Sequence, residues 1–252
     1  MVCLVSLGLS GCTSKYGEQT AIVKSYSDCY APIQKLRNEE HRVAKQTAGG
    51  AVAGALVGGL IGGLAGGGRG AAVGAVSGAA VGGAGSYYFS VRQQSKNENI
   101  RMARYMQDIK GDISGLNIAT ASARMSIQCY EKKFETSLAR YKAKTISREQ
   151  FQDSYKEIKS GVDEAHRILG VIISSAQEQD AQYKQALDEE EKLHQMPAKA
   201  ARGGSPPPAP IKRSSLNEVK RTQTSYQTSI SNAQKTQKEA EDFNARMAEN
   251  MV

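Results

Sequence analysis

Large side chains are scarce in this chain of 252 residues, which has no tryptophan, four phenylalanines and an aromatic content of 6%. A wide globular core needs such side chains, so their scarcity excludes a bulky single core and favours burial along seams between helices. The histidines are isolated, and none has a second ligand at the helical spacing of a zinc site. They are His41, His166 and His194. We therefore expect no metal site and no cofactor.

Catalytic signatures are also missing. The glycines do not end in the Gly-Lys-Ser/Thr of a phosphate-binding loop, and no serine has the context of a nucleophile elbow. The acidic run at 189–191 is typical of a solvated helix end. A thin coiled coil offers no concave pocket for a substrate. We therefore expect no catalytic residues and no enzymatic activity.

The charge balance is basic, with a formal net charge of +8. The basic residues are spread along the chain and mixed with acidic ones, and no run has the density of a nucleic-acid-binding arm. This pattern favours ordinary solvated helix faces and no nucleic-acid partner. Contact with the phosphates of lipid or lipopolysaccharide is the alternative.

The start of the chain carries an apolar stretch that ends in Leu9-Ser10-Gly11-Cys12. This motif resembles the bacterial lipobox. The resemblance implies that residues 1–11 are a lipoprotein signal peptide and that Cys12 becomes the acylated, palmitate-bearing first residue of the mature protein. Thr13 stands where an aspartate would favour the inner membrane, so the resemblance implies the outer membrane. The alternative is a plain hydrophobic start that happens to end in cysteine.

Residues 49–85 hold the strongest pattern in the sequence. Glycines recur every four residues in two groups, at Gly50, Gly54, Gly58, Gly62 and Gly66, and at Gly70, Gly74, Gly78 and Gly82. This spacing stacks the glycines along one groove, through which two helices can approach closely in a bilayer. The halves 48–65 and 71–89 would each be about 27–28 Å long as helices, which matches a hydrocarbon core.

The pattern therefore predicts a transmembrane glycine-zipper hairpin over residues 48–89. Its halves contain no charge, and Arg69 lies in the expected turn. Tyr87, Tyr88 and Phe89 are expected to form an aromatic belt at the membrane interface. The alternative is a flexible Gly/Ala linker, although a linker would contain Ser, Thr and Asn rather than Val, Leu and Ile.

The run Gly66-Gly67-Gly68-Arg69-Gly70 between two such segments, behind a lipobox, resembles the glycine-zipper outer-membrane lipoproteins of the SlyB-like and 17-kilodalton surface-antigen-like kind. The resemblance covers residues 49–85 and Cys12. Nothing after Ser90 matches, and the small C-terminal β domain of that family is not evident here. The resemblance implies insertion in a lipid bilayer, a homo-oligomer and a role in envelope integrity.

The rest of the chain predicts an all-α fold. Apolar residues at heptad spacing run from Met102 to Tyr141 and again from Phe151 to Leu193, with a break at 145–150. Ser147 and Gln150 fit a capping box at the start of the second helix. A short break between two long heptad helices predicts an antiparallel coiled coil over residues 90–196, folded about residue 146.

Residues 197–212 are rich in proline and glycine and predict a linker. A third helix is expected over residues 213–252, with a weak, polar seam. Three fates are open for it: it packs on the antiparallel hairpin, it pairs with a partner, or it stays partly disordered. Residues 12–47, before the glycines, are expected to be partly helical and periplasmic.

Cys29 and Cys129 remain once Cys3 leaves with the signal peptide and Cys12 is acylated. An even pair in an oxidising compartment suggests a disulfide. However, an unbroken helix from residue 88 would place Cys129 about 60 Å from the membrane. A bond within one chain would then need residues 29–48 to be extended, or a bend at Gly111–Gly115. Bonding between subunits and free thiols are the alternatives.

The leading hypothesis is a non-enzymatic outer-membrane lipoprotein whose hairpin oligomerises while its coiled-coil stalk reaches across the periplasm. The stalk would bind an envelope protein partner or support envelope integrity. One alternative is a pore-forming or secretion-machine subunit. Another is an inner-membrane protein with a cytoplasmic stalk, which the positive charges on both flanks of the hairpin would favour.

Overall fold

The computed structural model describes residues 16–47, 86–195 and 213–251, and in these ranges the chain is helical with no strand. The all-α prediction is therefore confirmed for this part of the chain. The helices are α1 (Ser27–Thr47), α3 (Ser86–Gln94), α4 (Glu98–Lys142), α5 (Arg148–Gln195) and α6 (Arg213–Glu249).

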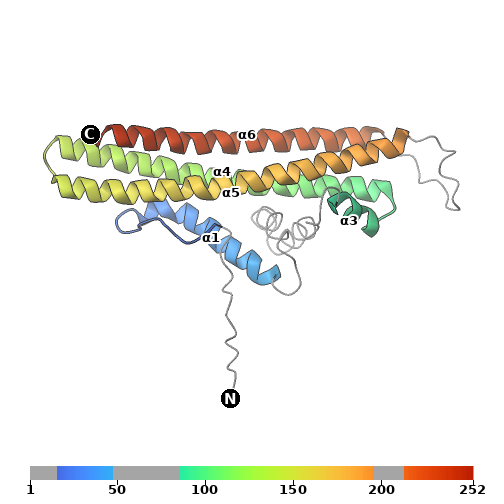
Figure 1. Cartoon of the computed structure of the whole chain (residues 1–252), viewed down its shortest axis with the longest axis horizontal. Helices are drawn as coiled ribbons and strands as arrows, with labels where there is room; N and C mark the ends of the chain where they lie inside the picture. The colour runs from blue at the N-terminus through green and yellow to red at the C-terminus, as the bar shows by residue number, and fades with distance from the viewer. Residues whose placement is uncertain (1–15, 48–85, 196–212, 252) are drawn as a thin grey trace, which may run out of the picture.

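Helices α4, α5 and α6 form a long three-helix bundle (Figure 1). Helix α4 alone has 45 residues, so the bundle is about 68 Å long. The sequence predicted α4 and α5 as an antiparallel pair, and the structure confirms it. Helix α6 packs along both of them over its length. Of the three alternatives for the third helix, the structure shows the one in which it packs on the antiparallel pair α4 and α5.

The turn between α4 and α5 has the predicted capping box. The backbone N–H of Ser147 donates to Gln150 Oε1 at 2.9 Å, and the N–H of Gln150 donates to Ser147 Oγ at 3.2 Å. Lys144 just before it has a φ of 58°, a left-handed conformation that lets α4 end abruptly. Local sequence therefore fixes where the two long helices reverse direction.

The predicted heptad seams form the core of the bundle. Ile109, Leu116 and Tyr130 of α4 are fully buried, as are Ile158 and Ala165 of α5. Tyr130 packs directly over α5 at a glycine. A Cβ atom on Gly161 would lie 2.3 Å from the Tyr130 ring, so this close approach requires glycine there. The few aromatic rings of the chain thus fill a narrow seam rather than a wide core.

Helices α1 and α3 pack on the α4/α5 side of the bundle, and neither contacts α6 (Figure 1). Both views place α1 and α3 on one side and α6 on the other. Helix α1 begins against the bundle and descends away from it toward Thr47. The bundle therefore has one side that carries the N-terminal elements and one side that is formed by α6.

The predicted aromatic belt is wrong for two of its three rings. Tyr87 and Tyr88 are only 2% and 3% exposed, because α3 packs them against the bundle. Tyr87 lies 5.2 Å from the Tyr183 ring and donates its hydroxyl proton to Asp108 at 2.8 Å. Phe89 is 65% exposed, and its place at a membrane interface stays a prediction. Residues 86–89 therefore belong to the bundle and not to the glycine segment.

Several predictions fall on residues that the structure does not describe. They are the signal peptide at 1–11, Cys12, the glycines from Gly50 to Gly82 and the linker at 197–212. Among the helices that the structure does describe, none is both long enough and apolar enough to cross a bilayer.

Candidate functional site

An extended segment, residues 16–26, lies along α5 and is held there by hydrogen bonds to its backbone. Because the segment has no regular secondary structure, its N–H and C=O groups need partners from elsewhere. Glu157 of α5 supplies one set. Its Oε1 accepts the backbone N–H of Lys24 at 2.7 Å, of Ser25 at 2.8 Å and of Tyr26 at 2.9 Å. One buried carboxylate thus fixes the turn that leads into α1.

Glu164, seven residues further along α5, has no exposed side-chain surface and holds the next part of the segment. Its Oε2 accepts the N–H of Thr20 at 2.8 Å and the N–H of Ala21. Its Oε1 accepts the Tyr30 hydroxyl at 2.9 Å and pairs with the Arg37 guanidinium. Burial alone would raise the pKa of Glu164, but these donors outweigh burial and hold the pKa below its usual range.

Two arginines hold the carbonyl groups of the same segment. Arg37 of α1 donates to the carbonyl oxygens of Gly17 at 2.9 Å and Glu18 at 3.1 Å. Arg167 of α5 donates to the carbonyl of Tyr16 and to that of Glu18 at 3.1 Å. Acids therefore hold the N–H groups and arginines hold the C=O groups. We call residues 16–37 the docked N-terminal segment.

A disulfide joins the docked N-terminal segment to α4. Cys29 and Cys129 are bonded within the chain, with their Cα atoms 5.2 Å apart. The predicted distance between the two cysteines is wrong, because α1 begins against the bundle beside Cys129. The helix that was expected to run unbroken from residue 88 is also interrupted, since α3 ends at Gln94 and Asn97 caps α4. Neither predicted route, an extended 29–48 or a bend at Gly111–Gly115, is needed.

The carboxylate of Asp28 lies within 4.8 Å of both sulfur atoms. A metal ion would need the two cysteines as thiolates, and here both sulfurs are used in the bond between them. Lys133 Nζ instead lies 3.0 Å from Asp28 and neutralises it. The chemistry of this group is therefore that of a structural crosslink.

A second polar cluster lies where α3 meets α4 and α5. Its repeated unit is a buried tyrosine hydroxyl that donates to a buried carboxylate. Besides Tyr87 and Asp108, Tyr183 donates to Asp112 at 2.6 Å, and Tyr105 donates to Glu190 at 3.1 Å. Arg101 completes the cluster with two bonds of 2.6 Å to the carboxylate of Glu190. These bonds fix the end of the bundle where the chain enters from residue 85.

Burial opposes the charge of Asp112 in this cluster, and it raises the pKa of Asp108 as well. Burial raises the pKa of Asp112 to about 7, and the charge of Asp108 adds to this rise, while the Tyr183 hydroxyl lowers it. Glu98 behaves similarly, since burial and the charge of Glu190 raise its pKa to about 7. Both acids therefore change protonation near neutral pH.

We predict that the free energy of unfolding falls as the pH rises from about 4 to about 7. In this window the unfolded Asp112 carboxyl has lost its proton and the folded one still holds it, so each step in pH favours the unfolded chain. Asp112→Asn should remove about 1–4 kcal/mol of this dependence, because the amide oxygen still accepts from Tyr183 but cannot ionise. Urea unfolding at about pH 5 and about pH 8 measures the difference.

The exposed Asp153, replaced by Asn, is the matched control and should leave the pH dependence unchanged. If Asp112→Asn shows the same pH dependence as the parent chain, the assignment of this titration to Asp112 is wrong.

Of the predicted site residues, the structure brings together Cys29 and Cys129. It does not describe Cys12 or the glycine ladder, by which we mean the glycines repeated every four residues from Gly50 to Gly82. Sequence reasoning missed Glu157 and Glu164, although a signal was present. Two acids stand seven residues apart beside an apolar heptad seam, a spacing that keeps both on one face of α5. The expectation that the acidic run at 189–191 is a solvated helix end is wrong for Glu190, which is fully buried and bonded to Arg101 and Tyr105.

Comparison of the chain with protein-family models, curated proteins and solved structures gives no match.

Proposed function

We propose that this protein is a non-enzymatic, membrane-anchored lipoprotein of the bacterial envelope. Cys12 carries the acyl chains, and the glycine segment at 48–85 forms an oligomerising transmembrane hairpin. The three-helix bundle is the periplasmic part, which contributes to envelope integrity or binds an envelope protein partner. The glycine-zipper lipoproteins that the sequence resembles have such a role.

The disulfide is the observation that carries this proposal. Structural disulfides form and persist in oxidising compartments such as the periplasm and are rare in the cytosol. Cys29 is fully buried and bonded to Cys129. This arrangement supports a bundle outside the cytoplasm and weighs against the alternative of an inner-membrane protein with a cytoplasmic stalk.

The docked N-terminal segment supports a mechanical role for the bundle. It begins four residues after Cys12, and its backbone is bonded to α5 through Glu157, Glu164 and Arg167. A force applied at an acyl anchor would therefore pass into α5, and through the disulfide into α4.

The proposal predicts two kinds of membrane attachment that can be separated by a Cys12→Ser variant. The variant should lose incorporation of labelled palmitate, yet it should stay in the membrane pellet after a carbonate wash, because the hairpin remains. Release of this variant by carbonate would contradict the hairpin. Incorporation of label into the variant would contradict lipidation at Cys12.

The glycine ladder can be tested in the same membranes with the paired changes Gly58→Leu and Gly62→Leu. Leucine fills the groove through which helices approach, so oligomers on a native gel should be lost while carbonate resistance is kept. Unchanged oligomers would place assembly elsewhere in the chain.

A further inference from the structure

The exposed apolar side chains of the bundle are unevenly distributed. Among the described residues, the exposed large hydrophobic side chains are Ile22, Phe89, Ile100, Ile118 and Met125. All belong to the docked N-terminal segment, α3 or α4, and none belongs to α5 or α6. Phe89 at 65% and Ile100 at 56% are the most exposed, and both lie at the junction of α3 with α4. The bundle thus has a more apolar side and a more polar side.

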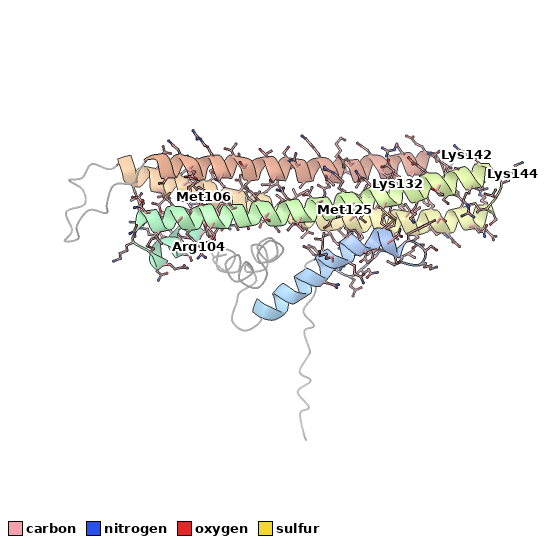
Figure 2. The ribbon with its side chains drawn as sticks, turned by 180° about the vertical axis from the view of Figure 1, so that it is seen from behind. Arg104, Met106, Met125, Lys132, Lys142 and Lys144 are labelled. Atoms are coloured by element: carbon pink, nitrogen blue, oxygen red, sulfur yellow. A yellow bond between two sulfur atoms is a disulfide. The ribbon has the colours of Figure 1, made fainter. Side chains whose placement is uncertain are left out.

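The exposed charged side chains at the junction of α3 with α4, residues 86–107, are all positive. Arg92 and Lys96 are exposed, and Arg104 is half-buried beside α3 (Figure 2). The one acidic residue in this range, Glu98, is buried, with 6% exposed. Arg104 pairs with Asp108 at 3.0 Å, so the exposed cations of this junction are Arg92 and Lys96. An exposed phenylalanine and isoleucine beside these two cations match the interface of an anionic bilayer, where rings enter the acyl boundary and cations meet phosphates.

The outer face of α6 differs in kind. Its exposed side chains carry both signs of charge, with Lys235, Lys238, Glu239 and Asp242 in close succession. Lys238 and Asp242 pair at 3.5 Å across one turn of the helix. Such a mixed surface is typical of a helix that faces water.

Chain length fixes how far the bundle can lie from a lipid anchor. Tyr16 is buried against the bundle, and its carbonyl is held by Arg167 of α5. Tyr16 follows Cys12 by four positions, so the two Cα atoms are at most about 14 Å apart. The middle of α5 is therefore held close to the acylated residue.

A second point of attachment lies further along the same side. Helix α3 begins at Ser86, directly after the glycine segment, and contacts α5 at Tyr183. Sixteen residues of helix separate Arg167 from Tyr183, which is about 24 Å along the bundle axis. Two attachments this far apart, both near the membrane, leave a tilt of less than about 35° from the membrane plane.

We infer that the bundle lies lengthwise on the membrane, with its α1 and α3 side against anionic headgroups and α6 facing the aqueous compartment. This orientation replaces the upright stalk that the sequence suggested. Phe89 and Ile100 enter the interface, and Arg92 and Lys96 bind lipid phosphates. The inference rests on the proposed function, because it uses the acylation of Cys12 and the membrane location of the glycine segment.

A single tryptophan placed at residue 89 tests the orientation, since the natural chain contains none. The full-length Phe89→Trp protein is incorporated in vesicles that contain phosphatidylglycerol and lipids brominated near the headgroup end of the acyl chain. Its emission should move to shorter wavelength and be quenched at least about threefold more than that of Thr228→Trp on the exposed face of α6. Adding Arg92→Gln and Lys96→Gln should reduce this quenching.

The outcomes separate the orientation from the proposed function. If the protein resists carbonate but both tryptophans are quenched equally, or Trp at 89 is not quenched, the lengthwise orientation is wrong and the anchor stands. If carbonate releases the protein, the anchor itself is wrong. A shift of emission that occurs without vesicles and grows with protein concentration would show that a second copy, and not lipid, covers this patch.

Discussion

Replacing Cys29 and Cys129 together by serine is expected to lower the free energy of unfolding by about 3–5 kcal/mol. The bond joins residues that are 100 positions apart, so its removal frees a long loop in the unfolded chain. For a chain of this size the midpoint of thermal unfolding should fall by roughly 10 °C. Circular dichroism of the purified protein in detergent measures the midpoint.

Reductant provides the matching control. Dithiothreitol should lower the midpoint of the parent protein to that of the double variant and leave the variant unaffected. A parent protein that is insensitive to reductant after full reduction of its thiols would show that the docked N-terminal segment is held without the crosslink.

Glu164→Gln is the second change with a large expected effect. The substitution leaves the Arg37 guanidinium, of which 8% is exposed, without its opposite charge. Removing one partner of a buried ion pair costs about 3–5 kcal/mol, because the other charge stays buried. Urea unfolding measures the loss, and hydrogen exchange at the Ala21 amide shows whether the docked N-terminal segment has been released.

Two comparisons make this result specific. Glu189→Gln removes the half-buried partner of the exposed Lys192 and should leave the free energy of unfolding nearly unchanged, because water screens this pair. Glu164→Leu combined with Arg37→Leu removes both charges and should recover most of the stability lost in Glu164→Gln. Equal losses for Glu164→Gln and Glu189→Gln would mean that the buried pair contributes little.

Acidification adds a check on the same carboxylate. The pKa of Glu164 is lowered in the folded protein, so its contribution is present above the unfolded value near 4.5 and is lost as the pH falls through the folded value. This direction is opposite to that of Asp112. Protonation of Glu164 therefore lowers the free energy of unfolding as the pH falls, whereas ionisation of Asp112 in the unfolded chain lowers it as the pH rises from about 4 to about 7.

The bundle could be predicted from sequence because its signals are local and periodic. The α4/α5 reversal follows from the heptad seams and from Ser147 and Gln150, which satisfy each other across one turn. The contact of α6 could not be predicted, because its seam is short of apolar side chains. Gln223 is nevertheless buried and donates to Asp180 at 3.1 Å, a contact that only the folded arrangement supplies.

The docked N-terminal segment could not be predicted for a different reason. Its bonds to α5 join residues more than 120 positions apart, such as Ala21 with Glu164 and Arg37 with Glu164. The receiving side chains are charged, and charged residues on a helix are normally read as solvent-facing. The burial of Tyr87 was missed because a tyrosine after an apolar segment also fits a lipid interface.

The crosslink has one further consequence for the chain between residues 29 and 129. That stretch contains the whole glycine segment, α3 and most of α4, and the sulfur–sulfur bond closes it into a covalent ring. A protease that cuts once within this ring cannot separate the two fragments unless a reductant is present. Without reductant, a single cut between residues 48 and 85 therefore leaves α1 covalently joined to the bundle through the disulfide.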